Sequence, residues 1–390
     1  MTTKNLHMTH LDEYLYETGN SGANEAINTI YDIMHGNAKI TTKVDGAPAI
    51  FCGYDPKDKQ FFIGTKSVFN KTPKLYKSMA DIDANEVGEK AHKLKECMKY
   101  LPNIGIPLNT VLQGDLLFTE GDQKFQTIKN KRYITVHPNT LVYGWPANSE
   151  MGKKVSNHKM GIAFHTTYTG NDDLQEYRAH FGAMTGNLHS KEVLITDVNV
   201  NDKPAFTFEE KQHIIDLCSE ASSHIKSFDK IVKAMDLLPK SHVGAGIKTF
   251  VNTCVRKNFY PTETFGYNQY VSFVEDYWTD RVIEKLVTES AKNTKRAALK
   301  QLKRELANCR EDIEASFAFI NKIKEAKDFV LTKLNSTAMQ ESFVKTEAQI
   351  FETPPEGYVA VGETSALKLV DRLAFSRYNF SEEYKKGWQK

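Results

Sequence analysis

The sequence contains no run of about 18 consecutive apolar residues, the length that a helix needs to cross a bilayer. Its first 20 residues are polar and include no apolar segment of the kind found in secretory signals. Both absences argue against a membrane-spanning or secreted protein, so we expect a cytoplasmic location.

Cysteine is scarce as well. The chain of 390 residues has 5 widely spaced cysteines: Cys52, Cys97, Cys218, Cys254 and Cys309. Neither a C-x-x-C pair nor a Cys/His cluster occurs, which argues against a structural zinc site and a disulfide framework. We expect reduced cysteines that are mostly buried as small apolar side chains.

The common phosphate-binding and catalytic motifs are also missing. No G-x-x-x-x-G-K-[ST] loop occurs, and no G-x-G-x-x-G follows a strand pattern. H-E-x-x-H and G-x-S-x-G are absent too. If the protein handles nucleotides, it does so without a P-loop.

The charge is informative only locally, because the net charge is just +2. Residues 57–77 contain six lysines against a single acid, Asp58. A second basic stretch has positive residues three, four and seven positions apart, which places several on one helical face: Lys292, Lys295, Arg296, Lys300, Lys303 and Arg304. This basic stripe is either a solvated helix face or a surface for phosphate groups.

The first half of the chain has the pattern of short strands separated by turns. Residues 39–53 and 60–69 are strand-like and are joined by YDPKDK, which predicts a hairpin. Residues 79–101 have helical composition and spacing. Further strands are predicted at 110–118, 132–136, 140–145, 159–168 and 193–200. The pattern indicates an antiparallel sheet or paired sheets.

The pattern changes after Pro204. Residues 207–336 have apolar residues at three- and four-residue spacings and predict helices, and strands return at 356–361 and 366–370. In ALKLV, alternation places Leu367 and Leu369 on one side of a strand and Lys368 on the other. A lysine within an apolar strand needs a specific reason to be there.

Lys43 begins the motif K-x-D-G, a weak pattern that also fits a strand ending in a turn. Five further segments follow it in order: GTKSVFNK at 64–71, LQGDLLF at 112–118, TLVYGW at 140–145, PPEGYVAVG at 354–362 and ALKLVDR at 366–372. This ordered series resembles the motifs of the covalent nucleotidyltransferase superfamily of ATP-dependent DNA ligases, RNA ligases and mRNA-capping enzymes. It is especially similar to ligase-like proteins of large tailed bacteriophages, in which case the location is the host cytoplasm.

The resemblance covers about 39–145 and 354–376 and implies an α+β fold. We expect an antiparallel-sheet nucleotidyltransferase core, like a ligase adenylation domain, with a large all-helical insertion. The expected division is residues 1–204 for the first part of the core, 205–345 for the insertion and 346–390 for the last strands and the tail.

The resemblance also implies roles for individual residues. Lys43 would form a lysyl-adenylate with ATP, and Lys66 and Lys368 would lower its pKa and stabilise negative charge on the phosphates. Asp115 would contact the ribose or a metal-bound water, and Tyr143 would stack on adenine. Each residue also has a structural interpretation: Asp115 is equally a strand-edge acid, and Tyr143 a core aromatic.

A divalent metal, Mg²⁺ or Mn²⁺, is implied as the second cofactor. Glu356 is the expected ligand, with Asp45 in support, and Asp45 and Gly46 of the K-x-D-G motif would also contact the nucleotide. The structural alternative for both acids is a turn, since each precedes a glycine.

Two departures from the superfamily pattern affect the expected substrate. Ala47, Pro48 and Ala49 stand where many ligases carry an arginine, and only about 20 residues follow Val370, too few for an OB-fold.

The expected function is an ATP-dependent polynucleotide ligase that joins a 5′-phosphate to a 3′-hydroxyl, with RNA favoured over DNA. Nucleic acid would bind in the core cleft and along the basic stripe Lys292–Arg304. Alternatives are a DNA nick ligase, another adenylyltransferase and a non-catalytic nucleotide-binding phage protein.

Overall fold

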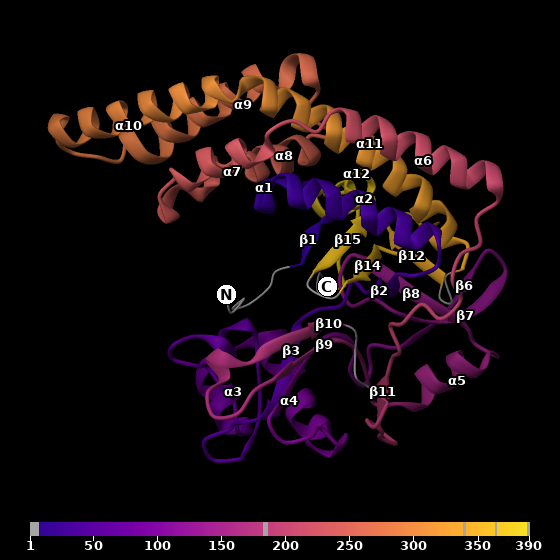
Figure 1. Ribbon diagram of the computed structural model, residues 1–390. Helices are drawn as coiled ribbons and strands as arrows, with labels where there is room; N and C mark the ends of the chain where they lie inside the picture. The colour runs from indigo at the N-terminus through magenta and orange to yellow at the C-terminus, as the bar shows by residue number, and fades with distance from the viewer. Residues whose placement is uncertain (1–7, 182–185, 338–340, 363–364, 388–390) are drawn as a thin grey trace.

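The computed structural model describes residues 8–181, 186–337, 341–362 and 365–387. They form a mixed α+β protein with three largely antiparallel sheets, and a helical layer covers one of them (Figure 1). Within these ranges, no helix combines the length and the apolar character needed to cross a membrane. All five cysteines are free and buried, as predicted.

Sheet A combines the two ends of the chain. Its strand order is β1 (Thr9–His10), β15 (Ala366–Val370), β14 (Gly357–Val361) and β2 (Lys39–Lys43). β1 runs parallel to β15, and the other neighbours are antiparallel. The predicted alternation in β15 is confirmed, because Leu367 and Leu369 are buried in the helical core while Lys368 faces the opposite side.

Sheet B contains β10 (Arg178–Phe181), β9 (Met160–Thr169), β5 (Thr110–Phe118), β3 (Ala49–Tyr54) and β4 (Phe61–Gly64), and β11 (Val193–Ile195) pairs with β9. The predicted hairpin is β3–β4. The predicted helix over 79–101 is divided into α3 (Met79–Asn85) and α4 (Gly88–Tyr100), because the backbone at Glu86 and Val87 is extended and Gly88 has a positive φ.

Sheet C has the order β13 (Ile350–Thr353), β12 (Glu341–Lys345), β8 (Leu141–Pro146), β7 (Lys131–Val136) and β6 (Lys124–Ile128). α5 (Glu150–Asn157) packs beside β7 and β8. The expectation that residues 205–345 are all helical is wrong at its end, because residues 341–345 form the strand β12. The strand forms because β8, nearly 200 residues earlier, offers it a free edge.

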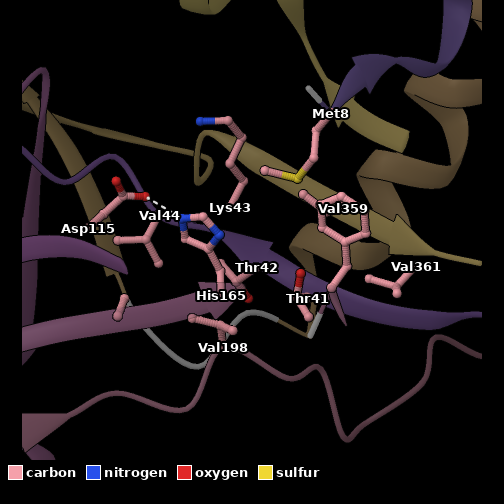
Figure 2. Close-up of a pocket in the computed structure, with 12 residues that line it drawn as sticks. Met8, Thr41, Thr42, Lys43, Val44, Asp115, His165, Val198, Val359 and Val361 are labelled. Carbon is pink, nitrogen blue, oxygen red and sulfur yellow. Dashed lines mark ion pairs between the residues drawn. The ribbon is translucent and has the colours of Figure 1, made fainter. Parts of the chain in front are cut away.

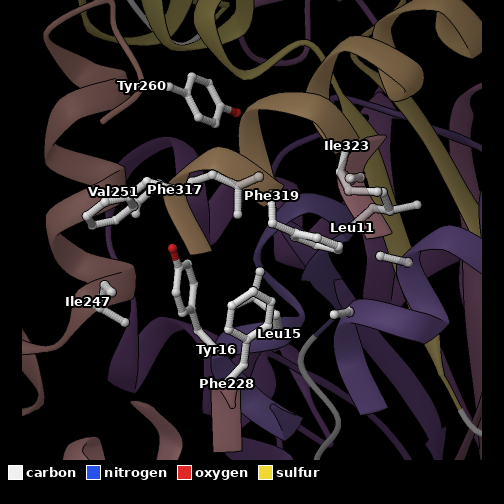
Figure 3. Close-up of a cluster of buried hydrophobic side chains, with 14 of the residues drawn as sticks. Leu11, Leu15, Tyr16, Phe228, Ile247, Val251, Tyr260, Phe317, Phe319 and Ile323 are labelled. Atoms are coloured by element: carbon white, nitrogen blue, oxygen red, sulfur yellow. The ribbon is translucent and has the colours of Figure 1, made fainter. Parts of the chain in front are cut away.

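The helical layer includes α6 (Phe208–Ser223), α7 (Phe228–Asp236), α8 (Ile247–Arg256), α9 (Glu263–Trp278), α10 (Glu289–Asn308) and α11 (Arg310–Asn335). It packs on α1 (Leu15–Thr18), on α2 (Asn20–Met34) and on one face of sheet A, and these elements share a hydrophobic core (Figure 3). Side chains from both ends of the chain and from the helical layer meet in it, among them Leu11, Phe317 and Leu367. The helices are therefore anchored directly to the sheet that carries Lys43 and Lys368.

The chain passes from sheet A to sheet B immediately after Lys43. The expected single strand over 39–53 is in fact β2 and β3, separated by residues 44–48. Along β2, the segment 198–200 makes hydrogen bonds from Thr42 N to Val198 O and from Val200 N to Ile40 O. This crossing places Lys43 at the junction of sheets A and B.

Candidate active site

Lys43 and Glu356 form the centre of the site. Lys43 ends β2, and its register partner on β14 is Gly357, so the residue before that glycine lies beside the lysine. The Lys43 Nζ donates to Glu356 Oε2 over 2.5 Å. The Glu356 side chain is 8% exposed and that of Lys43 24%, so the pair is largely shielded from water.

The charge environment of Lys43 differs from the expected one. Burial disfavours its ammonium form, but Glu356, Asp115 and Asp45 outweigh burial and raise its pKa. The expectation of a lowered pKa for Lys43 is therefore wrong. Lys66 starts the short helix η2 (Lys66–Phe69) after β4, and burial lowers its own pKa.

Two carboxyl groups near Lys43 have raised pKa values. Burial raises the pKa of Glu356 to about 7, against the effect of Lys43 and with a contribution from Asp45. Burial raises the pKa of Asp115 on β5 to about 7 in the same way. Both carboxyl groups are thus close to half-ionised at pH 7, and a cation bound beside them would favour their ionised forms.

His165 is a site residue that the sequence analysis missed. It lies on β9 with its Nε2 3.5 Å from Asp115 Oδ2, and Figure 2 shows both beside Lys43. Burial, Lys43 and Lys368 lower the pKa of His165 to about 4, so its imidazole is neutral at pH 7. Its signal in the sequence is a histidine that directly follows the apolar run MGIAF of a predicted strand.

Lys368 faces the same side of sheet A as Lys43. It pairs with Val359 on β14, which in turn pairs with Thr41 on β2. Burial lowers the pKa of Lys368, and the charge of Lys43 lowers it further. The structure therefore brings together Lys43 and Lys368, two of the three lysines that the resemblance singled out.

Asp45 and Gly46 shape the crossing loop. The Asp45 carboxylate accepts hydrogen bonds of 2.8 Å from Asn139 Nδ2 and from the backbone N–H groups of Thr140 and Leu141. These bonds anchor the loop to sheet C, so the carboxylate is not free for the metal role expected of it. A Cβ on Gly46 would lie 2.6 Å from Asp115 Cβ, so this close approach requires glycine.

Tyr143 does not have the position expected for stacking on adenine. Its side chain is 1% exposed in the core between sheet C and the crossing loop. Its hydroxyl accepts a hydrogen bond of 2.6 Å from Asp45 N–H. The structural interpretation therefore accounts for Tyr143, which supports the loop from behind.

A small cavity lies beside Lys43. Its volume is about 40 Å³, and its wall includes Met8, Lys43, Asp115, His165 and Val359 (Figure 2). This space holds a few water molecules but not a purine. A nucleotide would therefore require the walls of the cavity to move apart.

A second set of buried charges lies near the Lys43 site, and we call it the Asp12 cluster. Arg372 donates to Asp12 Oδ2 over 3.1 Å and to Glu13 Oε1 over 2.7 Å. Tyr260 Oη donates to Asp12 Oδ2 over 2.8 Å, and Lys327 Nζ lies 3.5 Å from Asp12 Oδ1. The cluster connects the N-terminal segment, α11 and α12 (Arg372–Phe380).

The basic stripe lies on α10, at the outer end of the helical layer (Figure 1). Lys292 and Arg296 pair with Glu289, and Lys303 pairs with Glu275. Half of the expected basic surface is thus paired with acids on neighbouring turns and helices. Lys295, Lys300 and Arg304 make no ion pair with the described residues, so they remain available for an anion.

The chain belongs to a family of unknown function, DUF6267, whose model matches residues 5–385. This match spans all three sheets and the helical layer. Neither a curated protein nor a solved structure matches the chain.

The side chains fit a phosphate-bound metal better than a metal held by protein ligands alone. No group of three or more potential ligands from His, Cys, Asp and Glu converges within the described ranges. Mg²⁺ commonly uses one or two carboxylates together with waters and substrate phosphates. Glu356 and Asp115 are the carboxyl groups beside Lys43 that fit this arrangement, whereas the Asp45 carboxylate is held by Asn139, Thr140 and Leu141.

Proposed function

We propose that the protein is an ATP-dependent nucleotidyltransferase of the polynucleotide-ligase type, with Lys43 as the nucleophile. The main support is the convergence on Lys43 of Glu356, Asp115 and Lys368, contributed by three different strands or their ends. These residues belong to motifs that occur in the superfamily order along the chain. The proposal includes an antiparallel nucleotidyltransferase core formed by sheets A and B.

The proposed reaction begins when Lys43 loses a proton. Glu356 lies 2.5 Å from Nζ and has a pKa raised to about 7, so its carboxylate is suited to accept that proton. The neutral amine attacks the α-phosphorus of ATP, an N–P bond forms and pyrophosphate leaves. Lys368 stabilises negative charge that develops on the phosphate oxygens, and a bound Mg²⁺ would add to this stabilisation.

Two transfers complete the proposed cycle. AMP passes from Lys43 to a 5′-phosphate, and a 3′-hydroxyl then attacks that phosphate and releases AMP. RNA is the favoured substrate, and the unpaired cations of α10 are a candidate surface for its backbone.

The first test is covalent labelling. Incubation with α-³²P-labelled ATP and Mg²⁺ should label the wild-type protein, and Lys43→Ala should abolish the label. Lys39→Ala is the matched control, because Lys39 is an exposed lysine at the other end of β2. Absence of label on the wild-type protein would overturn the proposal. If ATP nevertheless binds, a non-catalytic nucleotide-binding protein would be favoured instead.

A second test ranks the acceptors. The labelled protein is offered 5′-phosphorylated single-stranded RNA, nicked RNA and nicked DNA, and joined products are separated on a gel. We expect the highest yield with RNA. Labelling without joining of any of the three would favour an adenylyltransferase with another acceptor.

A further inference from the structure

A second cavity, lined mainly by polar and basic residues, lies on the outer face of sheet C. Its volume is about 390 Å³, and it is bounded by β6, β7, β12 and residues 385–387. The C-terminal segment closes one wall through hydrogen bonds from Lys385 N to Lys345 O and from Gly387 N to Asn139 O. Of the six motif segments, TLVYGW alone contributes to the wall, through Val142, and the residues to which the resemblance gives a role in ATP binding do not line the cavity.

The charge of this cavity is strongly positive. Four lysines line it: Lys124, Lys345, Lys385 and Lys386. The acid in its wall, Asp122, already accepts hydrogen bonds from the N–H and hydroxyl of Thr119. Lys385 pairs with the exposed Glu347, a contact that stabilises the fold little.

Two polar groups in the wall would gain from a bound anion. The Nε2 of His137 is buried without a hydrogen-bond partner, which is a costly arrangement. Lys386 is buried, and its ammonium donates to Thr140 Oγ1 over 3.0 Å and to Tyr378 O over 2.6 Å. Burial lowers the pKa of His137 to about 4, so its ring is neutral at pH 7, and an oxyanion would accept a hydrogen bond from the Nε2–H tautomer. The same anion would favour the charged form of Lys386, whose pKa burial lowers.

We propose that this cavity binds a terminal phosphate monoester. A dianion matches the excess of positive charge, and a cavity closed on one side by the C-terminal segment accepts the end of a molecule better than a continuous strand. The chemistry is shared by free nucleotides and by the 5′-phosphorylated end of an oligonucleotide. Binding here does not depend on the proposed function of Lys43.

The loop 137–141 connects this phosphate cavity to the Lys43 site. His137 lines the cavity, whereas Asn139, Thr140 and Leu141 donate to the Asp45 carboxylate on the other side. Lys386 holds the same Thr140 through its hydroxyl. One loop therefore supplies both the donors to the Asp45 carboxylate and part of the wall of the phosphate cavity.

The test uses the full-length protein and NMR signals of the His137 ring. Inorganic phosphate, AMP and a 5′-phosphorylated RNA tetranucleotide should each shift these signals, and the same RNA with a 5′-hydroxyl should not. Lys124→Ala/Lys345→Ala should weaken binding roughly tenfold or more per lysine. The control Lys153→Ala/Lys191→Ala removes two exposed lysines outside the cavity and should bind as the wild type does.

Further measurements distinguish phosphate binding in this cavity from the proposed function of Lys43. The Lys43→Ala variant should bind phosphate unchanged, because Lys43 does not line the cavity. AMP binding without RNA binding would assign the cavity to free nucleotides, and the reverse to strand ends. Unshifted His137 signals, equal binding by the Lys124→Ala/Lys345→Ala variant, or equal binding of the 5′-hydroxyl RNA would overturn the proposal.

Discussion

Two groups of buried charges lie close together in this protein, and they differ in how fully their carboxyl groups are paired with other residues. In the Asp12 cluster, Arg372, Lys327 and Tyr260 surround Asp12, and both oxygens of its carboxylate have partners. Around Lys43, burial raises the pKa values of the Glu356 and Asp115 carboxyl groups to about 7, and Asp115 lines the cavity beside Lys43. A buried carboxylate whose oxygens all have partners holds elements of the fold together. A buried carboxyl group with a raised pKa beside a cavity is suited to interact with a ligand.

The largest expected effect comes from breaking the saturated cluster. Arg372→Met leaves Asp12 and Glu13 buried without the cation that pairs with both of them, so the free energy of unfolding should fall by about 3–5 kcal/mol. Urea unfolding followed by circular dichroism measures this change. Arg377→Met, on the exposed side of the same helix, should change the value by at most about 0.5 kcal/mol. Equal urea midpoints for both variants would contradict a stabilising role for the cluster.

Asp45 lies beside Lys43, but both oxygens of its carboxylate accept hydrogen bonds, as those of Asp12 do. Asp45→Ala leaves the N–H groups of Thr140 and Leu141 without an acceptor, at a cost of about 3 kcal/mol. Asp45→Asn retains one acceptor oxygen and should cost less than half as much. The same urea measurement tests this order, and equal losses for the two variants would show that the carboxylate does not anchor the loop.

The carboxyl groups beside Lys43 should respond to pH with the opposite sign to Asp12, and Glu13, whose pKa burial also raises, should respond as they do. The pKa values of Glu356 and Asp115 are raised, so the folded state binds more protons, and their contribution to stability is lost as the pH rises from about 4 through 7. The pKa of Asp12 is lowered, so its contribution is lost only in acid. Between pH 5 and 8 we expect a loss on the order of 2 kcal/mol in urea experiments. Asp115→Asn/Glu356→Gln should flatten this dependence, and an unchanged slope would contradict the assignment.

The smallest expected effect is that of Lys43→Met on stability. The substitution removes a cation, but Glu356 can take up a proton because its pKa is already about 7. We expect a change in the free energy of unfolding within about 1 kcal/mol, although labelling by ATP should disappear. A loss as large as that of Arg372→Met would mean that Lys43 is a structural residue.

The sequence predicted much of sheet A and the position of its lysines. Lys368 was placed on the Lys43 side because its apolar neighbours alternate, and alternation is a local property. Tyr143 was misplaced because its burial depends on Asp45, 98 residues away, whose N–H donates to its hydroxyl. β12 was missed because its edge partner β8 lies far back in the chain.

The Asp12 cluster could not be predicted for a similar reason. Asp12 and Glu13 lie in a polar N-terminal stretch that is typical of a solvated segment, and Arg372 is 360 residues from Asp12. Nothing in the local pattern of either segment indicates that the charges are buried together. Only the pairing of β1 with β15 brings them into contact.

The separation of Lys43 from Glu356 by 313 residues has a consequence for synthesis of the protein. A ribosome adds about 5–20 residues per second, so β2 emerges roughly 15–60 s before the strand that pairs with it. During that interval β2 lacks β14 along one edge, a situation that favours association with other chains or a chaperone. The last strands to be translated thus complete both the sheet and its charged centre, and a nascent chain shortened before Gly357 would have neither.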